Sequence, residues 1–285
     1  PEKENKNFSR MENYFQKLLF LYSQRKKNPE YEFVPYKFGC YSYSAYADLV
    51  TMVKKENLTE NENNYQKNSS TDFVKSLKKE DAVLLHEVVK LYGSMNSNAL
   101  IKHTYINFPY YAINSTIAAT VLNEGQLAKV AQARKHSNDT ILFTIGYEGI
   151  SLEHYLNKLV QNDVKVLVDV RRNPLSMKFG FSKALLKRYC ENLGIEYIHI
   201  PEVGIHSDER QELNSQADYD NLFETYKVTT LAETKTQQEQ IINLLLKYKR
   251  IALTCFEDNI CQCHRKPLAE SIKNFPIFEY DVKHI

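Results

Sequence analysis

Residues 141–146 read Ile-Leu-Phe-Thr-Ile-Gly, and residues 164–170 read Val-Lys-Val-Leu-Val-Asp-Val. Short apolar runs rich in β-branched residues are typical of strands that are buried on both faces of a sheet. Ser151 can cap a helix between them, and the alternation continues with helices at 181–192 and 237–248 and strands at 197–200 and 251–254. Strands that alternate with helices of this length predict βαβ units and a mainly parallel, three-layer α/β sheet.

Polar side chains follow each of the four predicted strands. The first strand runs into Gly146, Tyr147, Glu148 and Gly149, the second into Asp169, Arg171, Arg172, Asn173 and Ser176, the third into Glu202 and His206, and the fourth into Cys255 and Glu257. Ligands of parallel sheets bind outside the carboxyl ends of the strands. We therefore expect these groups to converge on one pocket at that edge.

The densest set of reactive side chains follows the fourth strand, where Cys255, Glu257, Cys261, Cys263, His264 and Arg265 lie within eleven positions. Such groups are costly to bury for packing alone, because each needs a partner away from water. Neighbouring cations lower the pKa of a thiol, so Cys255 is a candidate nucleophile, Glu257 a candidate acid or base, and His264 their support. The alternative is that Cys255 is a small buried apolar residue.

A metal site is the rival interpretation of the same segment. Cys255, Cys261, Cys263 and His264 offer four ligands, the number that a structural zinc ion takes. The spacing Cys-x5-Cys-x-Cys-His differs from the cysteine pair of a zinc knuckle, and adjacent Cys263 and His264 would strain to share one ion. We therefore predict no metal ligand here, and the sequence names no cofactor.

The remaining polar groups indicate an anion-binding site. Gly146 and Gly149 bracket a strand-to-helix turn that can bind an anion through its backbone, although a plain tight turn explains them equally well. Arg171 shares a strand face with Asp169, and we expect it rather than Arg172 to bind phosphate or carboxylate. Asp169 is either a general base or the ion-pair partner of Arg171 or Arg265. The predicted ligand-binding residues are Gly146, Tyr147, Glu148, Gly149, Arg171, Ser176, Arg210 and Arg265, and the predicted catalytic residues are Cys255, Glu257, His264 and Asp169.

Four motifs follow one another across roughly residues 141–282: residues 143–149, residues 166–174 with Ser176, residues 197–204, and the Cys-x-Glu and Cys-His-Arg elements. In this order they resemble the domain of unknown function 488 family. The resemblance implies a Rossmann-like α/β fold and a site at these motifs, without a particular reaction. A Walker loop, a GxGxxG fingerprint, a His-Glu-x-x-His helix and a serine nucleophile elbow are absent from the sequence, which excludes the ordinary functions of those motifs.

The N-terminal part is predicted to be mostly helical. Apolar residues at spacings of three and four indicate helices near 10–25, 44–55, 72–79, 81–92 and 97–105, with an extended aromatic stretch at 31–40 and a solvated loop at 56–71. Residues 18–22 and 31–42 are similar to the start of the Panacea (SocA-like) antitoxin domain, which implies a winged-helix-like interaction module. We expect Tyr36, Phe38, Tyr41 and Tyr43 to form an exposed contact surface, because a small helical core cannot bury them all.

Length and composition indicate two globular domains. The chain has 285 residues, of which 43% are apolar and 25% are charged. We place a helical interaction domain at 1–125, a linker at 126–139 and the α/β domain at 140–285. Residues 1–140 carry 19 Lys and Arg against 15 Asp and Glu, a balance of +4, and the remainder carries 18 against 20, a balance of −2. A mildly basic N-terminal half permits nucleic-acid contact without requiring it.

These features favour an enzyme that acts on a nucleotide or nucleic-acid component through the strand-end pocket, and the antitoxin resemblance implies a defence or toxin–antitoxin setting. The alternative is a non-catalytic regulator that senses a small ligand while its N-terminal domain binds DNA or protein. The expected partners are an anionic small molecule or nucleic acid and a protein. No run of 18 apolar residues predicts a membrane span, and five cysteines with three in one motif favour reduced thiols and a cytoplasmic location.

Overall fold

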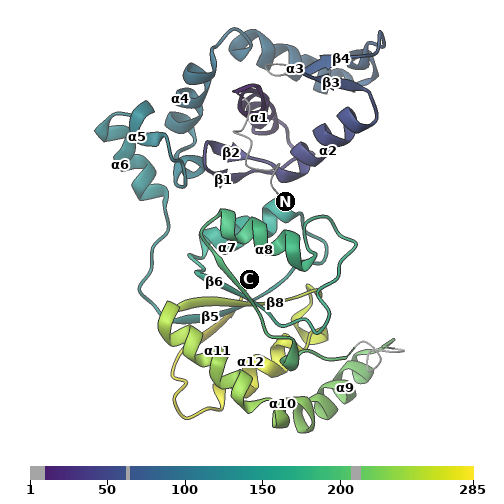
Figure 1. The fold of residues 1–285 in the computed structure, drawn as a ribbon, viewed down its shortest axis with the longest axis vertical. Helices are drawn as coiled ribbons and strands as arrows, with labels where there is room; N and C mark the ends of the chain where they lie inside the picture. Colours follow the sequence, from purple (N-terminus) through teal and green to yellow (C-terminus); the bar gives the residue numbers. More distant parts are fainter. Residues whose placement is uncertain (1–9, 62–64, 207–212) are drawn as a thin grey trace. The chain divides into compact units, whose positions relative to one another are not determined.

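The structure, a computed structural model, describes residues 10–61, 65–206 and 213–285 (Figure 1). It divides into two compact units, Pro1–Arg134 and Lys135–Ile285. The boundary falls inside the linker that we predicted at 126–139, and most of that segment belongs to helix α6 (Glu124–Ala133). Asn123 and Gln126 form a capping box at the start of α6, and Val130 is buried, so residues 126–133 of the predicted linker are helical. Residues 134–140 connect α6 to the first strand of the C-terminal unit.

The C-terminal unit contains a five-stranded parallel sheet in the order β7-β6-β8-β5-β9. Its strands are β5 (Ile141–Gly146), β6 (Val166–Asp169), β7 (Glu196–His199), β8 (Arg250–Cys255) and β9 (Asp281–His284). The predicted α/β fold and its four predicted strands are confirmed. The sequence did not predict β9, because its side chains are mostly exposed and give no apolar pattern. Pairing with β5 is what defines it.

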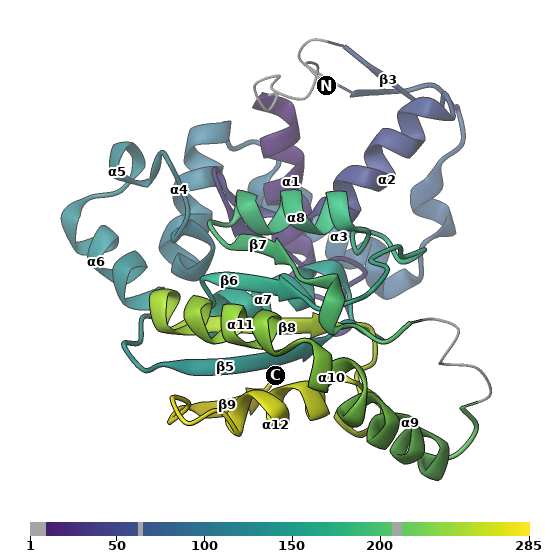
Figure 2. The same cartoon turned by 60° about the horizontal axis from the view of Figure 1, so that its bottom comes forward.

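Helices cover both faces of the sheet, which makes three layers (Figure 1). Helices α7 (Leu152–Gln161) and α8 (Lys183–Asn192) lie on one face, and α11 (Lys235–Tyr248) and α12 (Arg265–Lys273) lie on the other. Figure 2 shows that α9 (Gln216–Val228) and α10 (Thr230–Glu233) lead into α11. We had not predicted α9, α10 or α12. Among the described residues, no helix is both long enough and apolar enough to cross a bilayer.

The two faces of the sheet carry different side chains, because successive residues of a strand point in opposite directions. Leu253 packs in the core shared with α11 and α12, so Cys255 points to that face as well. Thr254 faces the other way, where its Oγ1 accepts a hydrogen bond of 2.7 Å from the Tyr155 hydroxyl on α7. Gly146 pairs with Cys255 and Asp169 pairs with Thr254, so β5, β6 and β8 end at the same level. The residues that follow these strands therefore meet at one edge.

The N-terminal unit is mostly helical, with α1 (Arg10–Ser23), α2 (Tyr43–Lys54), α3 (Lys79–Tyr92), α4 (Ser97–Asn107) and α5 (Ala118–Val121) before α6. An antiparallel hairpin, β1 (Val34–Tyr36) and β2 (Gly39–Tyr41), lies in the predicted extended stretch. A second hairpin, β3 (Leu58–Glu60) and β4 (Tyr65–Lys67), lies where we predicted a loop. Its side chains are exposed or half-buried, so sequence periodicity gives no sign of it. Phe73–Ser76 forms a 3₁₀ helix rather than an α-helix.

The aromatic residues around the first hairpin are buried, so the predicted exposed contact surface is wrong. Tyr36, Tyr41 and Tyr43 are only 5%, 4% and 6% exposed, and Phe38 is half-buried. The ring centroids of Tyr36 and Tyr41 are 5.3 Å apart, and those of Tyr41 and Tyr43 are 5.1 Å apart. Each ring thus covers its neighbours, and the cluster fills a core that the small helices alone would leave open.

Glu12 on α1 is a buried carboxyl group in this core. Burial raises its pKa from 4.5 to about 7, while a hydrogen bond of 3.0 Å from the Tyr41 hydroxyl acts in the opposite direction. Between these two pH values the unfolded chain releases the Glu12 proton and the folded chain keeps it. The free energy of unfolding of the N-terminal domain should therefore fall as the pH rises through this window.

Glu12→Gln should remove this dependence. At pH 8 the variant should be more stable than the wild type by up to about 3 kcal/mol, and this advantage should disappear at pH 4, where the carboxyl group is protonated in both states. Urea unfolding of the full-length protein, followed by circular dichroism, measures the difference at each pH. A difference that stays constant from pH 4 to pH 8 would show that Glu12 has an ordinary pKa.

Candidate functional site

A cavity of about 310 Å³ opens where β5, β6 and β8 end. Five residues of the predicted site line it: Tyr147, Arg171, Ser176, Cys255 and His264. Its lining also includes Arg172 and Asn173, which the sequence placed at this edge without a ligand-binding role, and Leu175, Met177 and Phe256, which the sequence did not name. The cavity therefore joins a polar wall from the segment after β6 to the sulfur and imidazole groups from the segments around β8 and α12.

Arg171 and Asp169 form a buried ion pair, which is one of the two roles that we considered for Asp169. The Arg171 Nε is 2.8 Å from Asp169 Oδ1, and its Nη2 is 2.5 Å from Oδ2. Arg171 Nη1 also donates to the Tyr147 hydroxyl at 2.7 Å and to the Phe181 carbonyl at 2.9 Å. The Tyr197 hydroxyl donates to Asp169 Oδ2. Most of the donors of Arg171 are thus engaged within the protein.

Arg172 is better suited than Arg171 to bind an anion. Its side chain is exposed and lines the cavity, and its hydrogen bond to the Pro201 carbonyl is long, at 3.4 Å. Asn173 and Ser176 lie on the same cavity wall. The sequence indicated that the two adjacent arginines cannot both point inward and favoured Arg171 as the anion-binding residue, but the structure pairs Arg171 with Asp169 instead.

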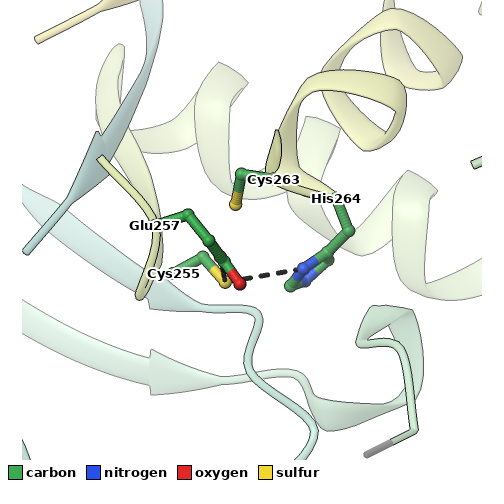
Figure 3. Close-up of side chains that lie close together, drawn as sticks. All are labelled: Cys255, Glu257, Cys263 and His264. Carbon is green, nitrogen blue, oxygen red and sulfur yellow. Dashed lines mark hydrogen bonds between the residues drawn. The ribbon is translucent and has the colours of Figure 1, made fainter. Parts of the chain in front are cut away.

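Four reactive side chains meet next to the cavity (Figure 3). The sulfur atoms of Cys255 and Cys263, a carboxylate oxygen of Glu257 and a ring nitrogen of His264 all lie within 4.8 Å of one another. We call these four residues the thiol cluster. Cys255, Cys263 and His264 are at most 1% exposed, whereas Glu257 is half-buried. From the sequence we predicted three of them as site residues, and we considered Cys263 both as a competitor for the same catalytic roles and as a ligand of the rejected zinc site.

The hydrogen bonds of His264 define its tautomer. Its Nε2 is 3.1 Å from the Val170 carbonyl, which can only accept, so Nε2 carries the hydrogen. The Nδ1 lone pair then faces Cys255 Sγ at a distance of 3.5 Å. A lone pair in this position can take the thiol proton of Cys255 or bind a metal ion.

Electrostatics in the thiol cluster disfavour a bare thiolate at Cys263. Burial raises the pKa of the Cys263 thiol well above its usual value, and the neighbouring Cys255 and Glu257 raise it further. The Arg265 guanidinium acts in the opposite direction, and its Nη1 is 3.6 Å from Cys263 Sγ. The Cys263 thiol therefore keeps its proton in this buried place unless further positive charge enters the cluster.

The turn after β5 has a structural role. Only Tyr147 of the four predicted residues 146–149 lines the cavity. Gly146 lies against the loop after β8, where an added Cβ would be 2.0 Å from the Glu257 carbonyl oxygen. Glu148 accepts a hydrogen bond of 3.2 Å from the Asp258 backbone nitrogen, so it ties the same loop. Gly149 is exposed with a φ of 74°, as a tight turn requires.

Arg265 also holds this loop rather than lining the cavity. Its Nη1 donates to the Glu257 carbonyl and its Nη2 donates to the Asp258 carbonyl at 3.0 Å. Ser176 lines the cavity and accepts a hydrogen bond from the Lys178 backbone nitrogen. Arg210, the remaining predicted ligand-binding residue, lies outside the described residues.

Comparison with known proteins gives a match in the C-terminal domain. No curated protein and no solved structure matches the chain. The family model described as "Domain of unknown function DUF488" matches residues 151–272, which include β6, β7, β8 and the whole thiol cluster. Residues 151–272 of this chain are therefore similar to the domain of unknown function 488 family.

Proposed function

We propose that the C-terminal domain is an enzyme that acts on a nucleotide or nucleic-acid component bound in the cavity. The observation that carries this proposal is the composition of the cavity, which joins an exposed arginine to a buried set of thiol, imidazole and carboxylate groups. Arg172, with Asn173 and Ser176 beside it, would bind the anionic group. The thiol cluster would be the reaction centre, with the half-buried Glu257 as its acid or base.

The apolar part of the cavity supports a substrate that has a ring as well as an anion. Phe256 is 42% exposed and lines the cavity, as do the exposed side chains of Leu175 and Met177. Aromatic side chains stack on nucleobases of any sequence, and apolar neighbours widen that contact. A phosphate on Arg172 and a base near Phe256 would account for both parts of the lining.

The full-length protein should bind a nucleoside monophosphate and convert some member of a panel of nucleotides and short oligonucleotides. Arg172→Ala should weaken binding by about 10-fold or more, because a charge-assisted hydrogen bond contributes about 1.5–3 kcal/mol. Isothermal titration measures the affinity, and chromatography of the incubated panel detects turnover. Cys255→Ser should abolish turnover.

Lys187→Ala is the matched control, because it removes an equally positive side chain that is exposed on α8. It should leave the affinity unchanged. Binding that depends on Arg172 without turnover of any panel member would favour the ligand-sensing alternative. Equal affinities for both variants would contradict the role of the cavity.

We also propose that the N-terminal domain is an interaction module, because its sequence resembles the Panacea (SocA-like) antitoxin domain. A winged-helix-like shape, a protein or nucleic-acid partner and a defence or toxin–antitoxin setting are parts of this proposal. The tyrosines of the first hairpin give no support to this proposal, because they are buried and cannot form the contact surface that the sequence predicted. A cytoplasmic location fits the free thiols of the five cysteines, since the thiol cluster requires reduced sulfur.

A further inference from the structure

The donor atoms of the thiol cluster lie close to the spacing of a metal site. In a tetrahedral site with metal–ligand bonds of about 2.0–2.3 Å, neighbouring ligand atoms are about 3.3–3.8 Å apart. Cys255 Sγ is 3.1 Å from Glu257 Oε2 and 3.5 Å from His264 Nδ1, and all four donors lie within 4.8 Å of one another. Figure 3 shows the four side chains pointing toward a common centre. Small side-chain rotations would complete the site.

We propose that Cys255, Glu257, Cys263 and His264 bind one divalent transition-metal ion, for which zinc is the best match. Two sulfur donors, one nitrogen and one oxygen suit a borderline-soft cation, whereas magnesium and calcium prefer oxygen donors alone. With the ion bound, Cys255 is a ligand and not the free nucleophile that the sequence predicted. The inference goes beyond the proposed function, because metal binding requires no substrate and is measured without one.

Neighbouring groups orient two of these ligands. The Nε2 of His264 donates to the Val170 carbonyl, which directs the Nδ1 lone pair into the cluster. Metal-binding histidines use such a bond to a carbonyl or carboxylate to fix their tautomer. The Arg265 Nη1 is 3.6 Å from Cys263 Sγ and can donate a hydrogen bond to a metal-bound thiolate.

The charge of the buried cluster favours a divalent ion. Two thiolates and one carboxylate carry −3, the ion contributes +2, and Arg265 contributes +1, so the sum is zero. Cys255, Cys263, His264 and Arg265 are at most 2% exposed, and neutrality matters most for buried groups. The ion thus offsets the charge that the two thiols acquire when they release their protons and bind it.

The backbone explains how adjacent Cys263 and His264 both reach the ion. From the sequence we expected adjacent side chains to strain to share one ion, and neighbours on a regular strand do point to opposite sides. Here Cys263 is extended (φ −123°, ψ 133°) and His264 is helical (φ −62°, ψ −16°), because α12 begins at the next residue. This change of conformation lets both side chains face the cluster. Cys261 is exposed, and its Sγ lies 3.9 Å from Lys266 Nζ.

Metal analysis of the full-length protein tests the proposal. Protein produced in zinc-containing medium and desalted should hold about one equivalent of zinc, the content of a closed four-ligand site. Cys255→Ser and Cys263→Ser should lower the affinity by at least about 10-fold. Cobalt added to the metal-free wild type should give a one-to-one titration with thiolate-to-cobalt absorption, which reports sulfur ligands without any substitution. In the zinc-loaded protein, Cys255 and Cys263 should resist alkylation until a chelator is added.

Cys261→Ser is the matched control, because it removes a thiol from the same loop but outside the cluster. It should retain the zinc. Absence of zinc from the wild type together with absence of thiolate–cobalt absorption would overturn the proposal, and so would full zinc content in both Cys255→Ser and Cys263→Ser. Because none of these measurements uses a nucleotide, a failure here is separate from a failure of the proposed function.

Discussion

Arg171→Ala is expected to destabilise the C-terminal domain by about 3–5 kcal/mol, because it leaves a buried carboxylate without its cation. Asp169 is fully buried, and Arg171 is only 5% exposed. The substitution also removes the hydrogen bonds to the Tyr147 hydroxyl and the Phe181 carbonyl. Thermal unfolding followed by circular dichroism should show the transition of this domain lowered by about 10 °C or more.

Arg172→Ala is the control for this prediction, since the neighbouring side chain is exposed and should change the stability by less than about 0.5 kcal/mol. Replacing the whole pair, Asp169→Leu with Arg171→Met, should recover much of the loss, because apolar residues remove the unpaired charge. If Arg171→Ala were as stable as Arg172→Ala, the ion pair would be solvated and Arg171 would again be available to a ligand.

Gly146→Ala is expected to have the second large effect, because it separates β5 from the loop that carries Glu257. The new Cβ would be 2.0 Å from the Glu257 carbonyl oxygen and 2.7 Å from Arg265 Nη1. Backbone atoms must move to relieve such a contact, and overpacking of this kind costs about 3 kcal/mol or more. Urea unfolding should show the lower stability, and the displaced Glu257 should weaken zinc binding.

Comparing Gly146→Ala with Gly149→Ala, in the same turn, distinguishes a steric clash from backbone strain. In the part of the chain that the structure describes, no atom beyond the adjacent residues lies within 4 Å of an added Cβ at Gly149, but the φ of 74° disfavours alanine. The expected cost is about 1–2 kcal/mol, with zinc binding unchanged. Similar losses of stability and of zinc in both variants would show that the turn as a whole, rather than the approach to Glu257, determines the effect.

The sequence predicted the sheet well, because its central strands are buried on both faces and carry continuous apolar runs. β5, β6 and β8 were found in this way, with the helices α7, α8 and α11 between them. The hairpin of β3 and β4 and the strand β9 were missed for one reason. Their side chains are exposed or half-buried, so they form no apolar pattern in the sequence. These strands are defined by backbone hydrogen bonds to a partner strand.

The sequence predicted where the site lies, but it did not predict which side chains of the site contact one another. The alternation of strands and helices indicated which residues follow the carboxyl ends of the strands, and Cys255, His264 and Arg171 do line one cavity. Which arginine is buried depended on where Asp169 points. Cys263 and His264 can face the same point because the backbone changes from extended at Cys263 to helical at His264, directly before α12 begins. The sequence did not show this change.

The sequence by itself determined the α/β class, the order of its central elements and the concentration of thiol, carboxylate and imidazole groups after β8. These features depend on the pattern of residues that are close together in the sequence. The tertiary structure alone decided that Arg171 neutralises Asp169, that the tyrosines of the first hairpin are core residues, and that four donors meet within 4.8 Å. The tyrosine core and the donor cluster depend on contacts between different segments of the chain. Arg171 and Asp169 are near neighbours in sequence, but their pairing depends on the burial of both groups, which exists only after the chain has folded.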